Sequence, residues 1–495
     1  MNTTRAILII TVISAALFFF SDNKADPDLW GHLAFGREIS IEKQVPRMDS
    51  YSYSSPGAEW IDHEWLSELV FYKVFSRFGG AGLVLLKTSA GILTALLLLM
   101  SVSGKTKSVI MRLAFLLLSF SIISFGFLTR PQIFTYLFFT ALMVFLDRFR
   151  STGNRAWIYP LPLVFLVWAN SHGGFVAGLA ALALFYLVIS VKKGLDPALS
   201  AVCALSLLAT LVNPYGVELW GFLFRSLSSP RPYLYEWAGM ELSGDYADYL
   251  AAALIAVAAL VFSRIKRDPF DAALISAALF MSMLQKRHIV LYAVVFCVLT
   301  PPYAASLIGK PMKDLEKRIS AAALAALLSC LAFFFVCASL FFGKTDPLKI
   351  EIPPGKYPVN AVKFMKDNGI NGNIFCFFDW SQMCIWELPR SRVFFDGRYR
   401  TVYSEDLIRG YFGVLFSEKD HKAYLEDHPG TDIMLLHRLN PLVRDIELDL
   451  RWVRVYSSPV AVIFVKDDQK NRRVIEDLRE NRLINRPVEA PYYLE

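Results

Sequence analysis

Charged residues are scarce in this chain of 495 residues. They make up 19% of it, whereas a soluble globular protein has about 25%. Hydrophobic residues make up 55%, against roughly 45–50% in an ordinary soluble domain. This balance argues against a single soluble globular domain and predicts an integral membrane protein with a polar part attached.

Three further signatures are missing. The six cysteines show no C-x-x-C spacing and do not make a disulfide framework. No glycine-rich loop follows any predicted strand, so a cytoplasmic nucleotide-sugar site is not supported. Serine, histidine and aspartate, or cysteine and histidine, form no pattern typical of nucleophilic catalysis.

Long apolar stretches dominate the first 340 or so residues. A helix that crosses a bilayer needs about 20 mostly apolar residues. Eleven stretches qualify or come close: 5–21, 80–102, 109–128, 132–146, 157–171, 174–191, 198–213, 247–263, 270–285, 289–308 and 319–342. We therefore predict about eleven transmembrane helices.

Lysine and arginine accumulate on alternate sides of these stretches. If the N-terminus is cytoplasmic, the inside loops carry most of them, because basic residues favour cytoplasmic loops. The segment 22–78 and the residues after 343 are then extracytoplasmic. The absence of an A-x-A site after residue 21 favours a retained first helix over a cleaved signal peptide. The basic residues behind the net charge of +7 are explained by the membrane topology and give no sign of nucleic-acid binding.

The chain from residue 345 onward has a different pattern. Predicted strands at 373–378, 392–396, 432–437, 452–456 and 460–465 alternate with predicted helices at 359–368, 380–388, 404–415 and 418–427. Such alternation is typical of a small α/β domain. We expect a transmembrane domain of residues 1–344, with a long first periplasmic loop at 22–78, and an extracytoplasmic domain of residues 345–495. A disulfide between Cys376 and Cys384 stays open.

Two carboxylates stand directly after the first apolar stretch. Asp26 and Asp28 flank Pro27, which prevents the first helix from running on. In the simpler interpretation, Asp28 only caps the helix that follows. The loop is long for a connector, however, and it carries a second acidic group at Asp62 and Glu64.

Cationic side chains, or side chains that can become cationic, recur at the other predicted outer helix ends. They are Arg130, His172, Lys286, Arg287 and His288. Each could belong to an ordinary turn. As a set, opposite the acids of the first loop, they suit a phosphorylated lipid whose head group is the substrate.

Several stretches resemble the GT-C superfamily of glycosyltransferases, which take a sugar from a polyprenyl-phosphate donor. They are Asp28-Leu29-Trp30-Gly31-His32-Leu33, Asp62-His63-Glu64-Trp65, Arg130-Pro131-Gln132, Asn170-Ser171-His172-Gly173-Gly174 and Phe395-Asp396-Gly397-Arg398. The chain is most similar to the bacterial group related to the protein O-mannosyltransferase and aminoarabinose transferase families. Its Asp-Pro-Asp departs from the Asp-Glu pair of those families.

The resemblance implies a polytopic α-helical membrane protein of GT-C type with a C-terminal extracytoplasmic α/β domain. It also implies sugar transfer with inversion at the anomeric carbon. A carboxylate base should help a weakly nucleophilic hydroxyl, and positive charge should stabilise the departing phosphate. The base would be Asp28 or Asp26, and the donor phosphate would meet Arg130, His172, Lys286 and Arg287.

Asp396 and Arg398 follow a predicted strand, and ligands often bind beyond strand ends in α/β sheets, so we expect acceptor contacts there; the alternative is a turn with a structural Asp–Arg pair. His63 and Glu64 are expected at the acceptor or in contacts that pack the first loop against the helices. No cofactor is firmly implied. Asp26 and Asp28 could share a divalent cation, Mg²⁺ or Mn²⁺, through their D-x-D spacing, with His32, His63 and Glu64 nearby in the same loop.

The expected partners are a polyprenyl-phosphate-linked sugar, membrane lipids and a glycan, lipid or protein acceptor. The expected location is the bacterial inner membrane. Two alternatives remain, a flippase for lipid-linked saccharides and a ligase that moves glycans from polyprenyl diphosphate. Transporters often carry repeated halves and polar residues at the membrane midplane; neither is evident here, which favours an enzyme.

Overall fold

The computed structural model describes residues 3–228, 231, 233–241, 244–341 and 346–494. They form two compact units. The helical unit comprises Met1–Asn23, Leu83–Trp220 and Leu227–Leu348, and the α/β unit comprises Lys24–Gly82, Gly221–Ser226 and Lys349–Glu495. The long first loop therefore belongs to the same compact unit as the C-terminal residues.

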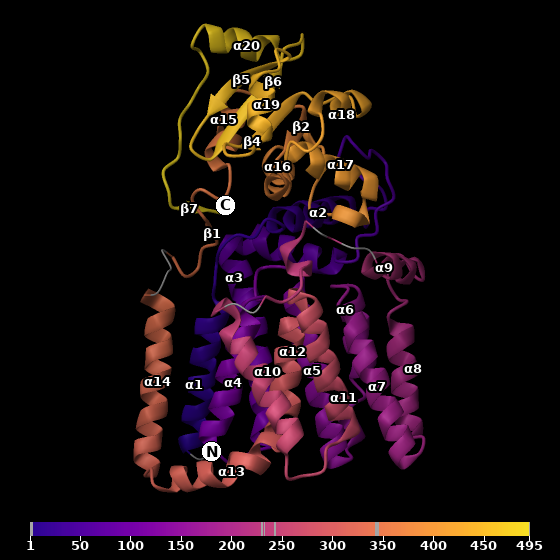
Figure 1. The fold of residues 1–495 in the computed structure, drawn as a ribbon, viewed down its shortest axis with the longest axis vertical. Coiled ribbons are helices and arrows are strands. Elements are labelled where there is room, and N and C mark those ends of the chain that lie inside the picture. The colour runs from indigo at the N-terminus through magenta and orange to yellow at the C-terminus, as the bar shows by residue number, and fades with distance from the viewer. Residues whose placement is uncertain (1–2, 229–230, 232, 242–243, 342–345, 495) are drawn as a thin grey trace. The chain divides into compact units, whose positions relative to one another are not determined.

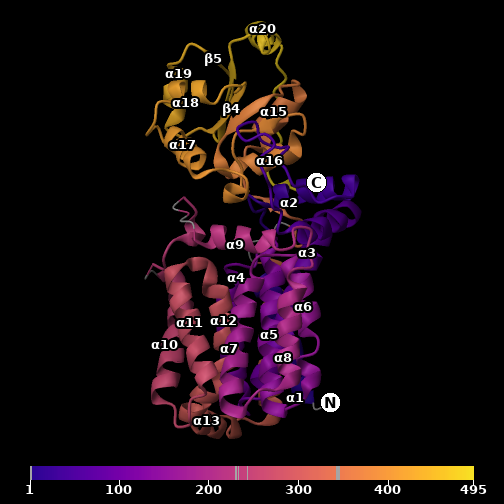
Figure 2. The ribbon, with the colours of Figure 1, turned by 90° about the vertical axis from the view of Figure 1, so that its right-hand side faces the viewer.

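The helical unit is a bundle whose helices run alongside one another in both views, except α13, which lies across one end of the bundle (Figure 1 and Figure 2). Its helices are α1 (Thr3–Phe20), the second part of α3 (Trp65–Ser103), α4 (Val109–Ser124), α5 (Gln132–Thr152), α6 (Leu161–Ala169), α7 (Phe175–Lys193), α8 (Pro197–Ala209), α10 (Ala247–Phe262), α11 (Pro269–Leu284), α12 (Ile289–Leu299), α13 (Pro301–Lys317) and α14 (Ala321–Phe341). Helix α9 (Glu218–Ser228) is amphipathic and divided among the two units.

Local sequence explains where several of these helices begin. The side chains of Ser108, Asp196 and Asp268 each accept a hydrogen bond from a backbone N–H in the first turn of α4, α8 and α11. Such caps satisfy donors that have no partner inside the helix. Pro197 and Pro269 follow two of them at the first helical position, where the missing N–H costs nothing.

Five helices of the described chain are long and apolar enough to cross a membrane: α1, α3, α5, α7 and α14. A sixth span results if Lys286–Leu299 and Pro301–Lys317, bent by 53°, count as one. Five further apolar helices are shorter, with 10–17 residues. The chain is thus a multi-pass membrane protein, while the count of about eleven spans stays a prediction.

Two predicted spans differ in form from the expectation. The helix expected at 80–102 begins at Trp65 and breaks at Gly79, whose φ of 58° and ψ of −156° lie outside the helical region. The single span expected at 289–308 is divided into α12 and α13 at Thr300 and Pro301, since a proline cannot continue a helix without loss of a hydrogen bond.

The α/β unit is built on a five-stranded sheet with the strand order β3-β2-β4-β6-β5. Its strands are β2 (Asn373–Cys376), β3 (Arg392–Val393), β4 (Ile433–His437), β5 (Trp452–Ser457) and β6 (Ala461–Lys466). Strands β3, β2 and β4 are parallel, and β6 pairs antiparallel with both β4 and β5. The central strands are almost wholly buried, as expected of a sheet covered on both faces.

Helices cover this sheet (Figure 1). They are α15 (Val359–Asp367), α16 (Ser381–Glu387), α17 (Glu405–Leu415), α18 (His421–Asp427), α19 (Leu442–Glu447) and α20 (Arg472–Arg479). The α/β architecture predicted for the C-terminal region is confirmed, although β3 is shorter than expected. Sequence periodicity missed α19, α20 and the small pair β1 (Glu351–Ile352) and β7 (Tyr492–Tyr493). Cys376 and Cys384 are buried free thiols.

The first loop joins this fold through backbone pairing. Ser52 forms a parallel bridge with Val393 of the edge strand β3. The N–H of Val393 donates to the carbonyl of Tyr51 at 3.0 Å, and the N–H of Tyr53 donates to the carbonyl of Val393 at 3.1 Å. The loop thereby covers a sheet edge that would otherwise expose unpaired backbone groups.

Candidate functional site

Asp26 and Asp28 occupy the entrance of α2 (Leu29–Glu42) in the α/β unit. Asp28 is the N-cap residue of α2, yet its side chain makes no capping hydrogen bond. Asp26 is buried, and its Oδ1 accepts the backbone N–H of Asp28 at 3.0 Å. Asp28 thus stands at the N-cap position, as the simpler interpretation expects, but its side chain supplies no capping hydrogen bond.

The backbone around this acidic pair is anchored to the C-terminal part of the unit. The N–H of Ala25 donates to the carbonyl of Glu351 in β1 at 2.7 Å. The hydroxyl of Tyr357 donates to the carbonyl of Ala25 at 3.1 Å, and its ring packs on Trp30 with centroids 4.8 Å apart. The position of the acids thus depends on residues far along the chain.

Asp396 and Arg398, predicted as acceptor or loop contacts, form a buried ion pair. Arg398 donates to Asp396 through Nε at 3.0 Å and Nη2 at 2.8 Å. Its Nη2 also lies 2.6 Å from Oδ1 of Asp49 in the first loop. The Tyr403 hydroxyl donates to Asp396 at 2.6 Å. The Arg398 side chain is only 4% exposed. Because it contacts both Asp396 and Asp49, it ties the first loop to the sheet.

Aromatic rings surround the guanidinium of Arg398. Its Cζ lies 5.4 Å from the ring centre of Phe35, 5.2 Å from that of Tyr51 and 4.8 Å from that of Trp60. Each distance is within the range of a cation–π interaction. Burial acts to lower the pKa of Arg398, but the adjacent Asp396 and Asp49 carboxylates raise it well above its usual value. The side chain therefore stays charged.

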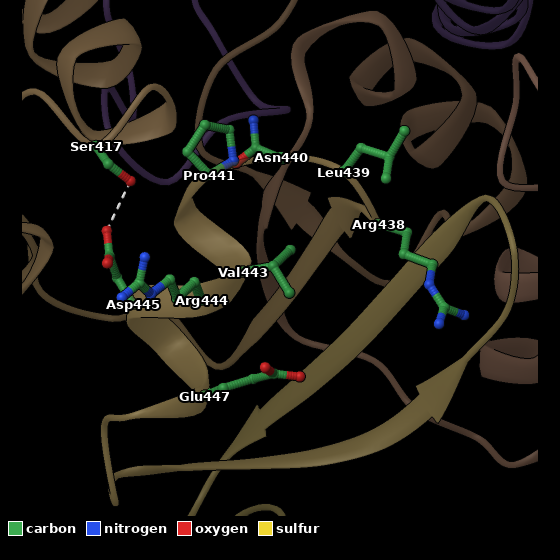
Figure 3. A pocket seen from close by; sticks show the side chains of 9 residues that line it. All are labelled: Ser417, Arg438, Leu439, Asn440, Pro441, Val443, Arg444, Asp445 and Glu447. Atoms are coloured by element: carbon green, nitrogen blue, oxygen red, sulfur yellow. Dashed lines mark hydrogen bonds between the residues drawn. The ribbon is translucent and has the colours of Figure 1, made fainter.

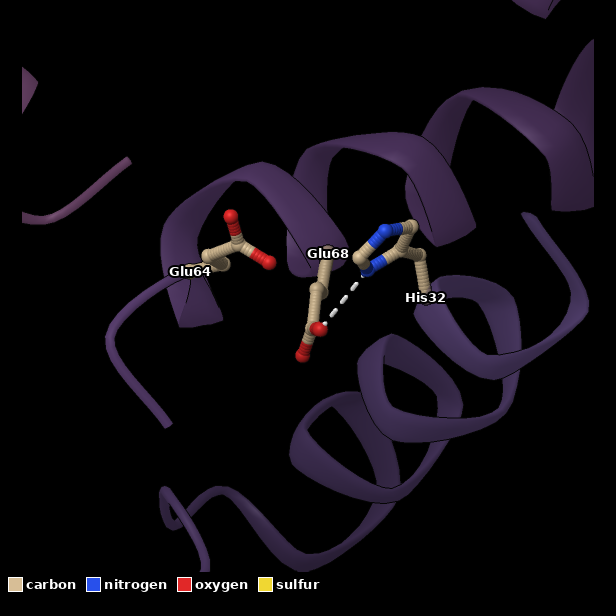
Figure 4. A group of neighbouring side chains, drawn as sticks. All are labelled: His32, Glu64 and Glu68. Carbon is tan, nitrogen blue, oxygen red and sulfur yellow. Dashed lines mark hydrogen bonds and ion pairs between the residues drawn. The ribbon is translucent and has the colours of Figure 1, made fainter. Parts of the chain in front are cut away.

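The residues of the first loop that could meet at one cation are His32, Glu64 and Glu68 (Figure 4). Their ligand atoms all lie within 4.8 Å of one another, and Nδ1 of His32 lies 2.9 Å from Oε1 of Glu68. Nitrogen and carboxylate oxygen are suitable ligands for several divalent ions. His63 lies beside Glu64, at 3.8 Å from its Oε1. The Mg²⁺ or Mn²⁺ site at Asp26 and Asp28 stays a prediction.

Burial raises the pKa of Asp62 to about 6 from 3.8, although Glu68, the Glu64 N–H and Arg398 act against the shift. The folded carboxyl therefore holds its proton more tightly than the unfolded one. Between about pH 4 and pH 6 the unfolded state binds fewer protons, so stability falls as the pH rises through this window. We expect Asp62→Asn to flatten this decline, as measured by thermal unfolding of the purified protein across the window.

The exposed Asp406 provides the control for this measurement. Asp406→Asn should leave the pH dependence of the melting temperature as it is in the wild-type protein. An Asp62→Asn variant that keeps the full decline would show that another group is responsible.

In the helical unit, three of the four predicted phosphate ligands converge on the segment 234–241. The guanidinium of Arg130 lies 3.4 Å from Glu236, and that of Arg287 lies 4.3 Å from the ring centre of Trp237. Nζ of Lys286 lies 2.6 Å from Glu241 and 3.5 Å from the ring centre of Tyr235. Backbone bonds from Met240 to Met283 and from Lys286 to Ala238 hold the segment against the end of α11.

His172, the fourth predicted phosphate ligand, is buried against α5. Its Nδ1 lies 2.7 Å from the hydroxyl of Thr135, which also accepts a hydrogen bond from Nε1 of Trp168 at 2.7 Å. Nδ1 also accepts the N–H of Gly174 at 3.0 Å. The short Asn170–Gly174 motif is thus a turn built around the imidazole, close in sequence to the start of α7.

Sequence reasoning missed several residues that the structure adds to these groups. Arg231 lies 4.2 Å from the ring centre of Trp237, so that two guanidinium groups share this indole. Asp49 and Gln382 belong to no motif recognised in the sequence. The local signals were an acid between two aromatic residues at 235–237, and Gly31 and Gly397 within the stretches that resemble the GT-C glycosyltransferases.

A pocket of about 430 Å³ opens elsewhere in the α/β unit (Figure 3). Apart from Ser417, which follows α17, its lining residues follow β4 and extend along α19: Arg438, Leu439, Asn440, Pro441, Val443, Arg444, Asp445 and Glu447. Ser417 donates to Asp445 at 2.6 Å. None of the predicted site residues lines this pocket.

Comparisons with known proteins identify the architecture. No family model matches the sequence, and no curated protein matches it. The oligosaccharyltransferase of Archaeoglobus fulgidus in its apo form is similar in structure, with a TM-score of 0.60, 13% identity, and coverage of 88% of this chain and 69% of its own.

ArnT from Cupriavidus metallidurans is similar over nearly its whole length. Its complex with undecaprenyl phosphate gives a TM-score of 0.53 at 11% identity, covering 94% of this chain and 98% of its own. Its apo state gives 0.54 at 11% identity, covering 93% and 97%. These proteins are GT-C superfamily members, and the present chain has the GT-C fold, as its sequence motifs predicted.

Proposed function

We propose that the protein is an inverting glycosyltransferase that takes a sugar from a polyprenyl-phosphate donor and passes it to a hydroxyl of an extracytoplasmic acceptor. The observation that carries the proposal is the Asp28 carboxylate, which stands at the entrance of α2 and does not cap the helix. The GT-C fold, and the undecaprenyl phosphate bound by ArnT, support a lipid-linked donor.

The roles follow from the chemistry of the reaction. The departing polyprenyl phosphate is already an anion of low basicity, so it needs positive charge rather than a general acid. Arg130, Lys286 and Arg287 offer that charge, and His172 is a fourth candidate. The acceptor hydroxyl is a weak nucleophile, and Asp28 or Asp26 would remove its proton as the bond to the anomeric carbon forms. A single displacement inverts that carbon.

The location belongs to the same proposal. We place the protein in a bacterial inner membrane with a cytoplasmic N-terminus, because basic residues then fall in the inside loops. The first loop and the C-terminal α/β region would face the periplasm. The acceptor there would be a glycan, a lipid or a protein.

Native mass spectrometry of the detergent-purified protein tests the donor. We expect a co-purified mass that corresponds to a polyprenyl phosphate, with or without a sugar. The bound fraction should drop at least tenfold in Arg287→Ala, because a charge-assisted contact to phosphate contributes roughly 1.5–3 kcal/mol. Arg155, which is half-exposed and pairs with Asp196 at 3.1 Å, provides the control variant Arg155→Ala.

The alternative outcomes are distinct. Only bulk phospholipid in the wild-type spectrum would contradict a stable donor site. A polyprenyl diphosphate carrying a glycan would instead identify a ligase or a flippase. Equal loss of lipid in Arg287→Ala and Arg155→Ala would remove Arg287 from the phosphate site.

A further inference from the structure

Gln382 of α16 is wedged against two glycines that come from distant parts of the α/β unit. A Cβ at Gly31 in α2 would overlap Oε1 and Cδ of Gln382, and a Cβ at Gly397 would overlap its Nε2. A side chain at either position would therefore displace the Gln382 amide from where it lies. Because neither glycine has a side chain, the amide of Gln382 fits between them.

The Asp28 carboxylate also lies against Gly397. A Cβ at Gly397 would also lie 2.5 Å from Oδ1 of Asp28. The Gln382 amide and the Asp28 carboxylate, from two different elements, thus both lie within 2.5 Å of the position that a Cβ at Gly397 would take. Gln382 is 5% exposed, and its Oε1 has no hydrogen-bond partner among the described residues. A buried amide of this kind is costly unless it serves a purpose.

We propose that Gln382 is a positioning residue for Asp28, so that the C-terminal α/β region is part of the machinery that places the base. This inference rests on the proposed function for the meaning of Asp28. Gly31, Gln382 and Gly397 together form the Asp28 seat. An amide packed this close to the carboxylate limits the rotamers that Asp28 can adopt, and a general base must be held in one position to act.

The seat is held rigidly from each side. Gly397 lies between Asp396 and Arg398, whose buried ion pair also takes in Asp49 of the first loop. Helix α16 begins directly after Trp380, which is fully buried and donates from Nε1 to the carbonyl of Lys356 at 2.8 Å. Catalytic groups need such support, because an error of about 1 Å in placement can cost two orders of magnitude in rate.

The seat also explains why Asp396 and Arg398 do not need to touch a substrate. Asp396 is wholly buried and Arg398 nearly so, and their charges are used on each other, on Asp49 and on Tyr403. Their role is to fix the turn that carries Gly397. The turn then fixes Gln382 and Asp28.

Carbodiimide labelling of carboxyl groups, with methylamine as the trapping amine and peptide mass spectrometry as the readout, tests the seat without any substrate. We expect Gln382→Met to raise the labelling rate of Asp28 by roughly fivefold or more, because it loses the amide beside the carboxylate. Asp26, in the same peptide, should change by less than about twofold, since its partner is the backbone N–H of Asp28.

Gln382→Glu separates positioning from space filling. It has nearly the shape of glutamine, so a residue that only fills volume would tolerate it better than methionine. A second carboxylate beside Asp28 would instead repel it and move it out of the seat, where carbodiimide reaches it more readily. We therefore expect the labelling rate of Asp28 to be highest in Gln382→Glu, intermediate in Gln382→Met and lowest in the wild-type protein.

Gln469, which is exposed, supplies the matched control Gln469→Met. Labelling of Asp28 at the wild-type rate in Gln382→Glu would overturn the proposal, as would a parallel rise at Asp26 and Asp28 in Gln382→Met. Because the assay needs no donor or acceptor, it can succeed even if sugar transfer is never detected, and it can fail while transfer is found. The two proposals are thus judged separately.

Discussion

Sugar transfer is expected to fall by roughly 10²–10⁴-fold when Asp28 is replaced by Asn, the range that a general base contributes. The change keeps the size of the side chain and removes its ability to take a proton. The measurement is transfer of radiolabelled sugar from the polyprenyl-phosphate donor that mass spectrometry identifies. Asp26→Asn should cost less, because the Asp26 carboxylate accepts the Asp28 N–H and acts on the backbone.

The double variant Asp26→Asn/Asp28→Asn provides the strictest form of this test. Transfer should then be at the level of membranes that lack the protein. Asp406→Asn, on the exposed first turn of α17, is the control and should retain full activity. Transfer that survives in the double variant would remove both carboxylates from the reaction and leave the proposed mechanism without a base.

Replacing Arg398 by Met is expected to destabilise the α/β unit by about 3–5 kcal/mol, the cost of leaving the partners of a buried ion pair uncompensated. Asp49 and Asp396 would remain buried without their cation. The stability of Arg398→Lys should lie between that of Arg398→Met and that of the wild-type protein. An ammonium keeps the charge but cannot reproduce the forked contact with Asp396. Urea unfolding followed by tryptophan fluorescence measures the difference.

Arg409 supplies the comparison for this experiment. It is exposed and pairs with Glu405 across one helical turn at 2.8 Å, so Arg409→Ala should leave the unfolding midpoint almost unchanged. An Arg398→Met midpoint equal to that of Arg409→Ala would mean that the buried cluster does not hold the first loop to the sheet. It would also count against the proposed Asp28 seat, because the turn that carries Gly397 depends on that cluster.

The α/β region could be predicted well because its signals are local. Short continuous apolar runs place β4 and β6, and the 3.6-residue period places α15 and α17, whatever they pack against. Strand β3 is shorter than expected because its pattern continues into Phe394 and Phe395, which are buried after the strand pairing has ended. Helix α19 was missed because it is short and follows Pro441.

The residues of the candidate site likewise divide into those that the local sequence reveals and those that it does not. Asp26, Asp28, Arg130 and Arg287 stand out in the sequence as charges next to long apolar runs, where charge is expensive. Gln382 does not stand out, since a neutral amide in an amphipathic helix looks like any surface residue. Asp49 likewise reads as an ordinary turn aspartate until Arg398 is placed beside it.

By itself, the sequence determined that the protein is embedded in a membrane, that an α/β region follows the apolar stretches, and that acids and cations lie at helix ends. These properties depend on composition and on short-range periodicity. Only the tertiary structure decided that the first loop shares a compact unit with the C-terminal residues, and that Gly31, Gln382 and Gly397 meet at Asp28. Periodicity reports which face of an element is buried; it carries no information about the partner from a distant part of the chain that buries it.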